Sequence, residues 1–281
     1  MIKRTRRRRL RALPINSLIP NILTVLALCA GMSAIRFALQ DNWQAAVAAV
    51  AIAGVFDGLD GRMARLLKGA TKFGAELDSL SDFIAFGVAP AFVVFLWSTH
   101  DIKGIGWIAA LAFSTCCALR LARFNTATEE PDRPVWTGYY FTGLAAPAGA
   151  GIALLPVMGS FLFGDNFLRQ PLLVSAWMLF VGLLMISRVP TYSLKRIRVR
   201  REHVLPTLVV VGLLAAVMVS FPWVVLTAVG CIYLLSVPFS FRSQRQFAAG
   251  RREIKASRQA DTSDRAETPD QADTADQREP E

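Results

Sequence analysis

Four aspartates lie within 26 residues of an otherwise apolar chain: Asp57, Asp60, Asp78 and Asp82. Helical spacing places the first two on one face of one helix, and the last two on one face of the next. Four facing carboxylates repel one another unless cations lie between them. All-oxygen ligands suit a hard divalent ion such as magnesium, manganese or calcium. Two such ions could share the carboxylates and clamp a phosphoryl group between attacking and leaving oxygens, which would be metal-dependent phosphoryl chemistry.

Small residues and one arginine share these helix faces. Gly61 and Ala64 follow the first pair of acids, and Gly74 precedes the second. Arg65 adds a planar fork of donors that suits phosphate. Small side chains let a flat ligand approach, but on membrane helices they more often let neighbouring helices pack. Because buried carboxylates also occur in ion pathways, the residues alone leave ligand contact, helix packing and a proton or cation pathway open.

Long apolar segments must position these residues. Of the 281 residues, 53% are hydrophobic and 19% charged, below the roughly 25% of charged residues usual in soluble domains. Apolar runs of about 18 residues indicate membrane spans, so the predicted fold class is all-α, a polytopic membrane helical bundle. The candidate helices are Ile19–Leu39, Trp43–Leu67, Phe73–Trp97, Ile105–Phe124, Tyr140–Phe163, Pro171–Ile186, Val204–Val219 and Trp223–Phe239. The last two are short and could instead form one re-entrant hairpin.

The basic residues are unevenly placed along the chain, whose net charge is +10. They gather in the N-terminus, the turn from Lys68 to Lys72, the end of the fourth helix, the block Lys195–Arg201 and the segment after the last helix. The other loops carry few. The positive-inside rule therefore predicts that both termini and the mouth of the acidic cleft face the cytoplasm. Beside membrane spans, such basic runs indicate contact with lipid headgroups rather than with nucleic acid.

The remaining sequence features indicate how the chain is divided. The four cysteines lie in apolar stretches without CxxC spacing, which argues against disulfides and zinc. The first apolar run lacks a clear cleavage site and is expected to remain as a membrane helix. The predicted divisions are a basic cytoplasmic N-terminus at 1–18, a catalytic transmembrane core at 19–190, a basic loop with two extra helices at 191–241, and a disordered cytoplasmic tail at 242–281.

The acids, glycines and arginine together resemble a known signature, that of the CDP-alcohol phosphotransferases, D-x2-D-G-x2-A-R-x8-G-x3-D-x3-D. All eight fixed positions are present: Asp57, Asp60, Gly61, Ala64, Arg65, Gly74, Asp78 and Asp82. The resemblance implies a membrane bundle of six core helices, with the last two helices as an addition. Members of the family are commonly homodimers, so it also implies a homodimer.

The resemblance also implies roles for single residues. Asp57, Asp60 and Asp78 would ligate two divalent ions, magnesium or manganese. Asp82 would lie near the same ions and act as the general base. The residues implied to contact the CDP-diacylglycerol are Gly61, Ala64, Arg65, Gly74, Thr71 in the turn, and Asn21 and Thr24 in the element "PNILT" of the first helix.

Two further segments bear on the acceptor alcohol. "LRLARFN" at 119–125 and "FTGLAAPAGAG" at 141–151 are similar to elements of the bacterial phosphatidylserine synthases within this family, although Ala145 stands where proline is common. This implies transfer of a phosphatidyl group to L-serine with release of CMP, at the inner membrane of a bacterium. Arg120 and Arg123 could contact the acceptor carboxylate or serve as positive-inside anchors. Asn125 could orient the serine amine or cap the helix.

Two alternatives remain at this point. Another acceptor, glycerol 3-phosphate or an inositol compound, would keep the chemistry and change the product. A cation or proton transporter would use the same acids as its pathway and would release no CMP.

Overall fold

The protein is described here from a computed structural model. The described residues are 15–129, 140–187, 190–192 and 204–236, apart from 68, 70, 103, 143 and 166. The residues at 1–14, the basic block at 195–201 and the tail from 237 lie outside the described residues, and what was predicted of them stays a prediction.

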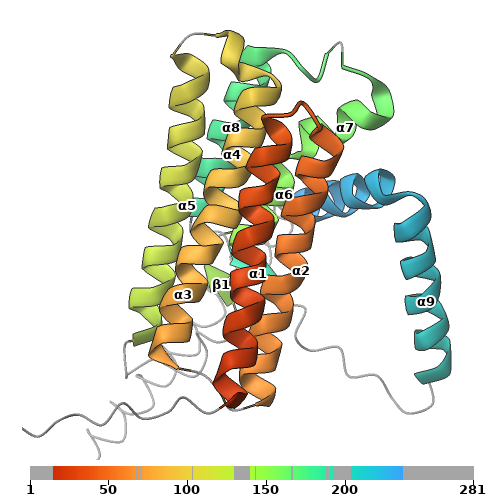
Figure 1. Ribbon diagram of the computed structural model, residues 1–281. Helices are drawn as coiled ribbons and strands as arrows, with labels where there is room; N and C mark the ends of the chain where they lie inside the picture. The colour runs from red at the N-terminus through yellow and green to blue at the C-terminus, as the bar shows by residue number, and fades with distance from the viewer. Residues whose placement is uncertain are drawn as a thin grey trace, which may run out of the picture.

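Helices make up almost all of the described structure and stand side by side in one bundle (Figure 1). Four of its rods are single helices: α1 (Ile15–Ala38), α2 (Trp43–Leu66), α5 (Ile105–Glu129) and α8 (Pro171–Ile186). A fifth rod joins three helices end to end: α3 (Lys72–Asp82), the π-helix η1 (Phe83–Val88) and α4 (Ala89–Trp97). The sixth consists of α6 (Ala146–Ala153) and α7 (Leu155–Phe163). Shorter elements are the 3-10 turn η2 (Thr99–Asp101) and the antiparallel pair β1 (Tyr140–Thr142) and β2 (Pro190–Tyr192).

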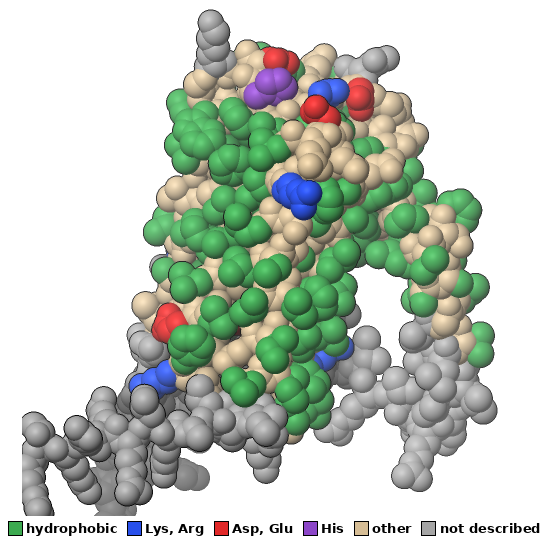
Figure 2. Space-filling view, in the orientation of Figure 1, with side chains coloured by type: hydrophobic (Ala, Val, Ile, Leu, Met, Phe, Trp, Pro, Cys, Tyr) green, Lys and Arg blue, Asp and Glu red, His purple; other side chains and the backbone are tan. Residues whose placement is uncertain are grey.

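These six rods overlap the first six predicted segments, which confirms the all-α membrane bundle. The fifth prediction, Tyr140–Phe163, was wrong at its start, because Tyr140–Thr142 pairs as strand β1 and the helix begins at Ala146. Five of them are long and apolar enough to cross a membrane, and α8, with 16 residues, is shorter. Apolar side chains cover most of the flank of the bundle in Figure 2, whereas acidic, basic and histidine side chains gather mainly at its upper end, with a few toward its lower end. A helix that exposes apolar residues along its length needs lipid around it. The chain is therefore a multi-pass membrane protein.

The C-terminal helices predicted as an addition are present beside the bundle. Helix α9 (Val204–Ser220) is followed by a helix at Pro222–Ser236, and the two are bent by 114° at their junction. Pro222 at this junction cannot continue the hydrogen bonding of α9, which accounts for the break. The second helix runs crosswise toward the bundle, while α9 stands apart from it (Figure 1). Taken as one broken span, the pair raises the number of candidate spans in the described chain to six.

Small residues bring the central helices close together. A Cβ atom added at Gly31 of α1 would lie 2.7 Å from the Cα atom of Ala85 in η1, so only glycine fits there. The large side chains of Phe86, Trp97 and Phe113, from η1, α4 and α5, are fully buried. This packing fixes α1 against the rod that carries two of the four aspartates.

The π-helix η1 begins directly after Asp82. Its wider turn is visible where the Ala89 N–H donates to the Ile84 carbonyl, five residues earlier. A π-helical turn leaves the α-helical pairing of the backbone incomplete, and the Ser114 hydroxyl of α5 donates to the Gly87 carbonyl at 3.2 Å. A continuous helix was predicted over 73–97, because the apolar pattern of the sequence does not reveal the extra residue of a π-helical turn.

Polar contacts join the chain segments at the end of the bundle opposite the aspartates. The Arg169 Nε donates to the Trp97 carbonyl at 2.8 Å, and the Ser98 hydroxyl donates to the Arg169 carbonyl at 2.8 Å. Arg169 also lies 3.5 Å from Asp165. These contacts hold the end of α4 to the segment that leads into α8, far along the bundle from the aspartates.

Candidate functional site

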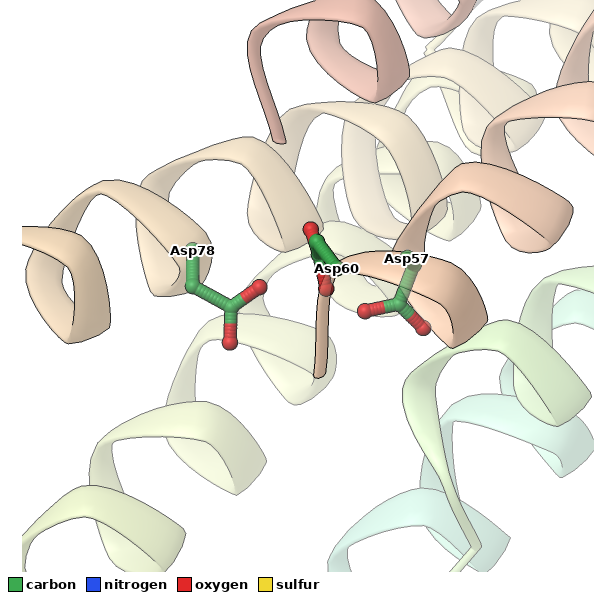
Figure 3. A group of neighbouring side chains, drawn as sticks. All are labelled: Asp57, Asp60 and Asp78. Atoms are coloured by element: carbon green, nitrogen blue, oxygen red, sulfur yellow. The ribbon is translucent and has the colours of Figure 1, made fainter. Parts of the chain in front are cut away.

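Three of the four aspartates form one group. Asp57 and Asp60 come from α2 and Asp78 from α3, and one carboxylate oxygen of each lies within 4.8 Å of the others. Figure 3 shows the three side chains converging on one space between the two helices. Asp60 is buried, and the other two are partly buried. An all-oxygen set of this size fits a hard divalent cation, so the group can hold a metal ion.

Asp82 lies beside this group rather than within it. It is the last residue of α3, and its carboxyl group shares a hydrogen bond with that of Asp57. Two carboxyl groups this close are stable only with a shared proton or a nearby cation. The structure thus joins all four acids through Asp57, with Asp82 on the side toward η1.

A polar network from α1 holds these acids in place. The Thr24 hydroxyl donates to Asp60 Oδ2 at 2.8 Å, and it also lies 3.1 Å from the Pro20 carbonyl. The Ser81 hydroxyl of α3 donates to the Thr24 carbonyl at 3.0 Å. Both hydroxyl side chains are buried. Thr24 was predicted to contact the nucleotide; here its hydroxyl orients one of the acids.

The small residues of the signature separate into two kinds. A Cβ atom at Gly74 would lie 2.8 Å from Asn21 Oδ1 and 3.2 Å from Thr71 Oγ1, so Gly74 lets α1 and α3 approach. A Cβ atom at Gly61 would meet nothing within 4 Å. The open space at Gly61 leaves room for a ligand, whereas the space at Gly74 is filled by the protein.

Thr71 and Arg65 both have partners on their own segments. Thr71 is the N-cap of α3, and its hydroxyl accepts a hydrogen bond from the Gly74 N–H at 3.0 Å. Such a cap fixes where the helix starts. Arg65 is exposed, and its Nε donates to the Gly61 carbonyl one turn earlier at 2.9 Å. Ala64 lies partly buried beside it. The nucleotide roles of these residues stay predictions.

Among the predicted acceptor residues, Arg120 faces the acids. It lies partly buried on α5 and interacts electrostatically with both Asp57 and Asp82. A guanidinium here sits beside the two acids that share a hydrogen bond. Its location fits a group that attracts an anion into the site.

The other two predicted acceptor residues tie helices together. Arg123 is exposed, and its Nη1 donates to the carbonyl of Ile186, the last residue of α8, at 2.9 Å. The Asn125 Nδ2 donates to the Ser79 hydroxyl at 2.8 Å, which joins α5 to α3 next to Asp78. Neither side chain caps its own helix in these contacts.

Sequence reasoning missed three residues near the site. Ser79 and Ser81 lie between Asp78 and Asp82, at positions that the signature leaves variable. Their hydroxyl groups were the sequence feature from which a role near the site could have been predicted. Tyr233, on the helix at 222–236, interacts electrostatically with Arg120. Nothing in the local sequence predicts this electrostatic interaction, because it depends on how a distant helix docks.

Comparison with known sequences identifies related proteins. The sequence model described as CDP-alcohol phosphatidyltransferase matches residues 17–187, and one described as CDP-alcohol phosphatidyltransferase 2 matches residues 202–238. A protein of Mycobacterium leprae named CDP-diacylglycerol–serine O-phosphatidyltransferase is 35% identical over 232 residues, 83% of this chain and 77% of that protein. A Helicobacter pylori protein with the same name is 35% identical over 192 residues, 66% of this chain and 77% of that protein.

A solved structure is also similar. It is the Mycobacterium tuberculosis phosphatidylinositol phosphate synthase PgsA1 with CDP-DAG bound, at a TM-score of 0.45 and 22% identity, covering 61% of this chain and 88% of that chain.

Proposed function

The chain belongs to the CDP-alcohol phosphatidyltransferase family, and we propose that it is a phosphatidylserine synthase. It transfers the phosphatidyl group of CDP-diacylglycerol to the hydroxyl of L-serine and releases CMP. The observation that carries this proposal is the convergence of Asp57, Asp60 and Asp78 in one group, in a chain similar over most of its length to proteins named for that reaction.

The four acids supply the sites for divalent cations. Asp57, Asp60 and Asp78 would hold one ion, and Asp82, through its position beside Asp57, would contribute to a second. We propose magnesium or manganese, because both prefer oxygen ligands and diphosphate. When bound, such ions neutralise the diphosphate of the donor and stabilise the charge that develops on the departing CMP.

The donor side of the site lies around the end of α2. Open space at Gly61 leaves room for the cytidine nucleotide, and the exposed Arg65 next to it offers N–H donors to the diphosphate. Thr71 and Asn21, which pack against Gly74 at the start of α3, are the other residues proposed on the donor side. The acyl chains of the donor would remain in the bilayer, against the apolar flank of the bundle.

The acceptor side lies toward Asp82 and Arg120. Asp82 takes the proton from the serine hydroxyl, whose oxygen forms a bond to the phosphorus that carries diacylglycerol. The bond from that phosphorus to the bridging oxygen breaks, and this oxygen leaves with CMP. Arg120 attracts the serine carboxylate, since its guanidinium is the cation that faces Asp57 and Asp82 from α5. Holding both reactants in this geometry supplies much of the rate enhancement.

The location of the reaction follows from the charge asymmetry of the sequence. We place the protein in the bacterial inner membrane, with both termini and the site on the cytoplasmic face, where serine and CDP-diacylglycerol are available. The catalytic core at 19–190 is followed by the two additional helices. A homodimer remains a prediction of the family resemblance.

The test is a reconstitution with defined substrates. Purified protein in detergent is incubated with CDP-diacylglycerol, manganese or magnesium, and either L-serine, glycerol 3-phosphate or inositol 1-phosphate. We expect CMP release that depends on serine, that Asp82→Asn abolishes, and that Asp165→Asn at the far end of the bundle leaves intact. Product formed only with another acceptor would overturn the serine assignment, and cation flux without CMP release would overturn the enzyme assignment.

A further inference from the structure

Helix α3 carries Asp78 and Asp82, and a serine stands beside each of them in sequence, Ser79 after the first and Ser81 before the second. We propose that these serines are positioning residues, which together fix the rotation of α3 about its axis and so direct both carboxylates toward the acids of α2. This inference rests on the proposed function, because the acids concerned are those of the proposed metal site, and it adds two residues outside the fixed positions of the signature.

The two serines lie on opposite sides of the acidic face of α3. Asp78 and Asp82 are four residues apart and share one face of the helix. Each residue turns an α-helix by about 100°, so Ser79 is displaced from this face in one direction and Ser81 in the other. Hydrogen bonds from the two side chains to different neighbouring helices would therefore resist rotation of α3 in both directions.

On one side, Ser81 contacts α1. Its side chain is buried, and its hydroxyl donates to the Thr24 carbonyl at 3.0 Å. Because the Thr24 hydroxyl donates to Asp60 Oδ2 at 2.8 Å, the same threonine contacts both α3 and an acid of α2. The position of Ser81 is thereby tied to that of Asp60 through three helices.

On the other side, Ser79 contacts α5. Its hydroxyl donates to the Ala75 carbonyl of its own helix at 3.0 Å and accepts a hydrogen bond from Asn125 Nδ2 at 2.8 Å. A hydroxyl has one hydrogen to donate, and the bond to the α3 backbone fixes its direction, so the oxygen is left to accept from α5. Asn125 therefore holds the side of α3 that lies opposite Ser81.

Apolar packing does little to fix this rotation. Of the 11 residues of α3, all of them described, only Ser81 is buried, whereas α4 buries several apolar side chains, Trp97 among them. Phe73 and Leu80 of α3 are exposed. The π-helix between α3 and α4 interrupts the regular α-helical pairing, so the packing of α4 does not fix α3 rigidly. Hydrogen bonds thus provide the restraint that interlocking side chains provide elsewhere in the bundle.

A small rotation of α3 would matter at the metal site. A helix with its side chains is about 10–12 Å across, so a rotation of about 20° moves a carboxylate at its surface by about 2 Å. The groups of such a site must be held to within about 0.5 Å. Rotation would therefore disturb the group in which oxygens of Asp57, Asp60 and Asp78 lie within 4.8 Å of one another.

The test measures Mn²⁺ binding without substrate, from the electron paramagnetic resonance signal of free Mn²⁺ during titration of the full-length protein in detergent. Ser79→Ala and Ser81→Ala should each weaken binding about threefold, by loss of one hydrogen bond while the other remains. The double variant should weaken it about 100-fold, the upper range for lost outer partners of metal ligands. We expect this loss to exceed the product of the single losses, because both serines act on one rotation although they share no partner.

Matched variants separate positioning from packing. Ser79→Thr keeps the hydroxyl and should bind Mn²⁺ like the wild type. Ser160→Ala removes a buried hydroxyl that donates to the Val157 carbonyl of its own helix, and it should also leave Mn²⁺ binding unchanged. Should Ser81→Ala not fold, Ser81→Cys, which has a weaker donor of similar size, takes its place and should show a smaller loss in the same direction.

The outcomes keep this inference separate from the proposed function. A wild type that binds Mn²⁺ but releases no CMP with serine defeats the proposed function, while Mn²⁺ binding by the variants still decides the role of the two serines. Binding by the double variant that equals that of the wild type overturns this role. A loss in the double variant that only equals the product of the single losses overturns the shared rotation and indicates two separate local contacts.

Discussion

Thr24 on α1 and Asp60 on α2 are joined by a hydrogen bond of 2.8 Å from the threonine hydroxyl to the carboxylate. The pair is buried, and 36 residues separate its members in sequence. Through it, the first helix of the bundle orients one of the acids of the proposed metal site. Partners of this kind fix the direction of a ligand's lone pairs.

Removing this hydroxyl should weaken the metal site. We expect Thr24→Val to lower the affinity for Mn²⁺ or the activity about 10–100-fold, as loss of an outer partner of a metal ligand commonly does. Thr24→Ser, which keeps the hydroxyl, is the matched control. A manganese titration of CMP release measures the effect, and equal affinities in all three proteins would show that Asp60 needs no such partner.

The two glycines of the signature should respond differently to alanine. Gly74→Ala places a methyl group 2.8 Å from Asn21 Oδ1, so we expect a loss of about 1–3 kcal/mol in unfolding free energy, as for other overpacked sites. Gly61→Ala meets open space and should leave thermal unfolding unchanged or slightly improved, while raising the KM for CDP-diacylglycerol.

A second substitution checks the cause of the first effect. Asn21→Ala removes the atom that Gly74→Ala would contact, so the double variant should regain much of the lost stability. Unfolding curves that show no such recovery would mean that Gly74 has another role.

Arginines 120 and 123 lie one turn apart on α5 and should behave differently. Arg123→Gln removes a hydrogen bond to the Ile186 carbonyl at the end of α8; it should lower the melting temperature slightly and leave the KM for serine within about twofold. Arg120→Gln should raise that KM at least about tenfold. A large KM change in Arg123→Gln would show instead that Arg123 contributes to binding of the acceptor.

The contact of Asn125 with Ser79 can be tested as a pair. If Asn125 acts by holding α3, then Asn125→Ala and Ser79→Ala should reduce kcat to similar extents, and the double variant should be no worse than either. Additive losses, with a higher KM for serine in Asn125→Ala alone, would show direct contact with the acceptor.

Divalent ions should stabilise the fold as well as support activity. A ligand at 100 times its dissociation constant adds about 2.7 kcal/mol to stability, so Mn²⁺ should raise the melting temperature of the wild type and EDTA should reverse the rise. We expect Asp60→Asn to lose this response and Asp165→Asn, in an exposed pair, to retain it. A rise that persists in Asp60→Asn would place the ion elsewhere.

The grouping of the acids in space could be predicted mostly from their spacing in the sequence. Asp57 and Asp60 share a helical face, and a short turn at 68–72 joins α2 to α3, so the grouping with Asp78 follows from periodicity and loop length. Contacts across the bundle could not be predicted in this way. The pairing of Thr24 with Asp60 depends on the height of α1 beside α2, which a single sequence does not encode locally.

The remaining differences have similar causes. Gly74 was compatible with clearance for a nucleotide or with packing, and only the position of Asn21 distinguishes them. The docking of the helix at 222–236 arises from a 114° bend at Pro222, which turns an apparent second span toward the core. Hydropathy predicted the helix at 222–236, but it gives no information on the direction of the helix relative to the bundle.

The π-helix after Asp82 divides its span into two halves whose side-chain faces are rotated relative to each other. A π-helical turn accommodates one more residue than an α-helical turn, and each residue corresponds to about 100° of rotation. The half formed by α3 can therefore turn its acids toward Asp57 and Asp60, while the half formed by α4 buries Trp97. One additional residue in a helical turn thus lets a single membrane segment carry polar acidic side chains at one end and apolar packing side chains at the other.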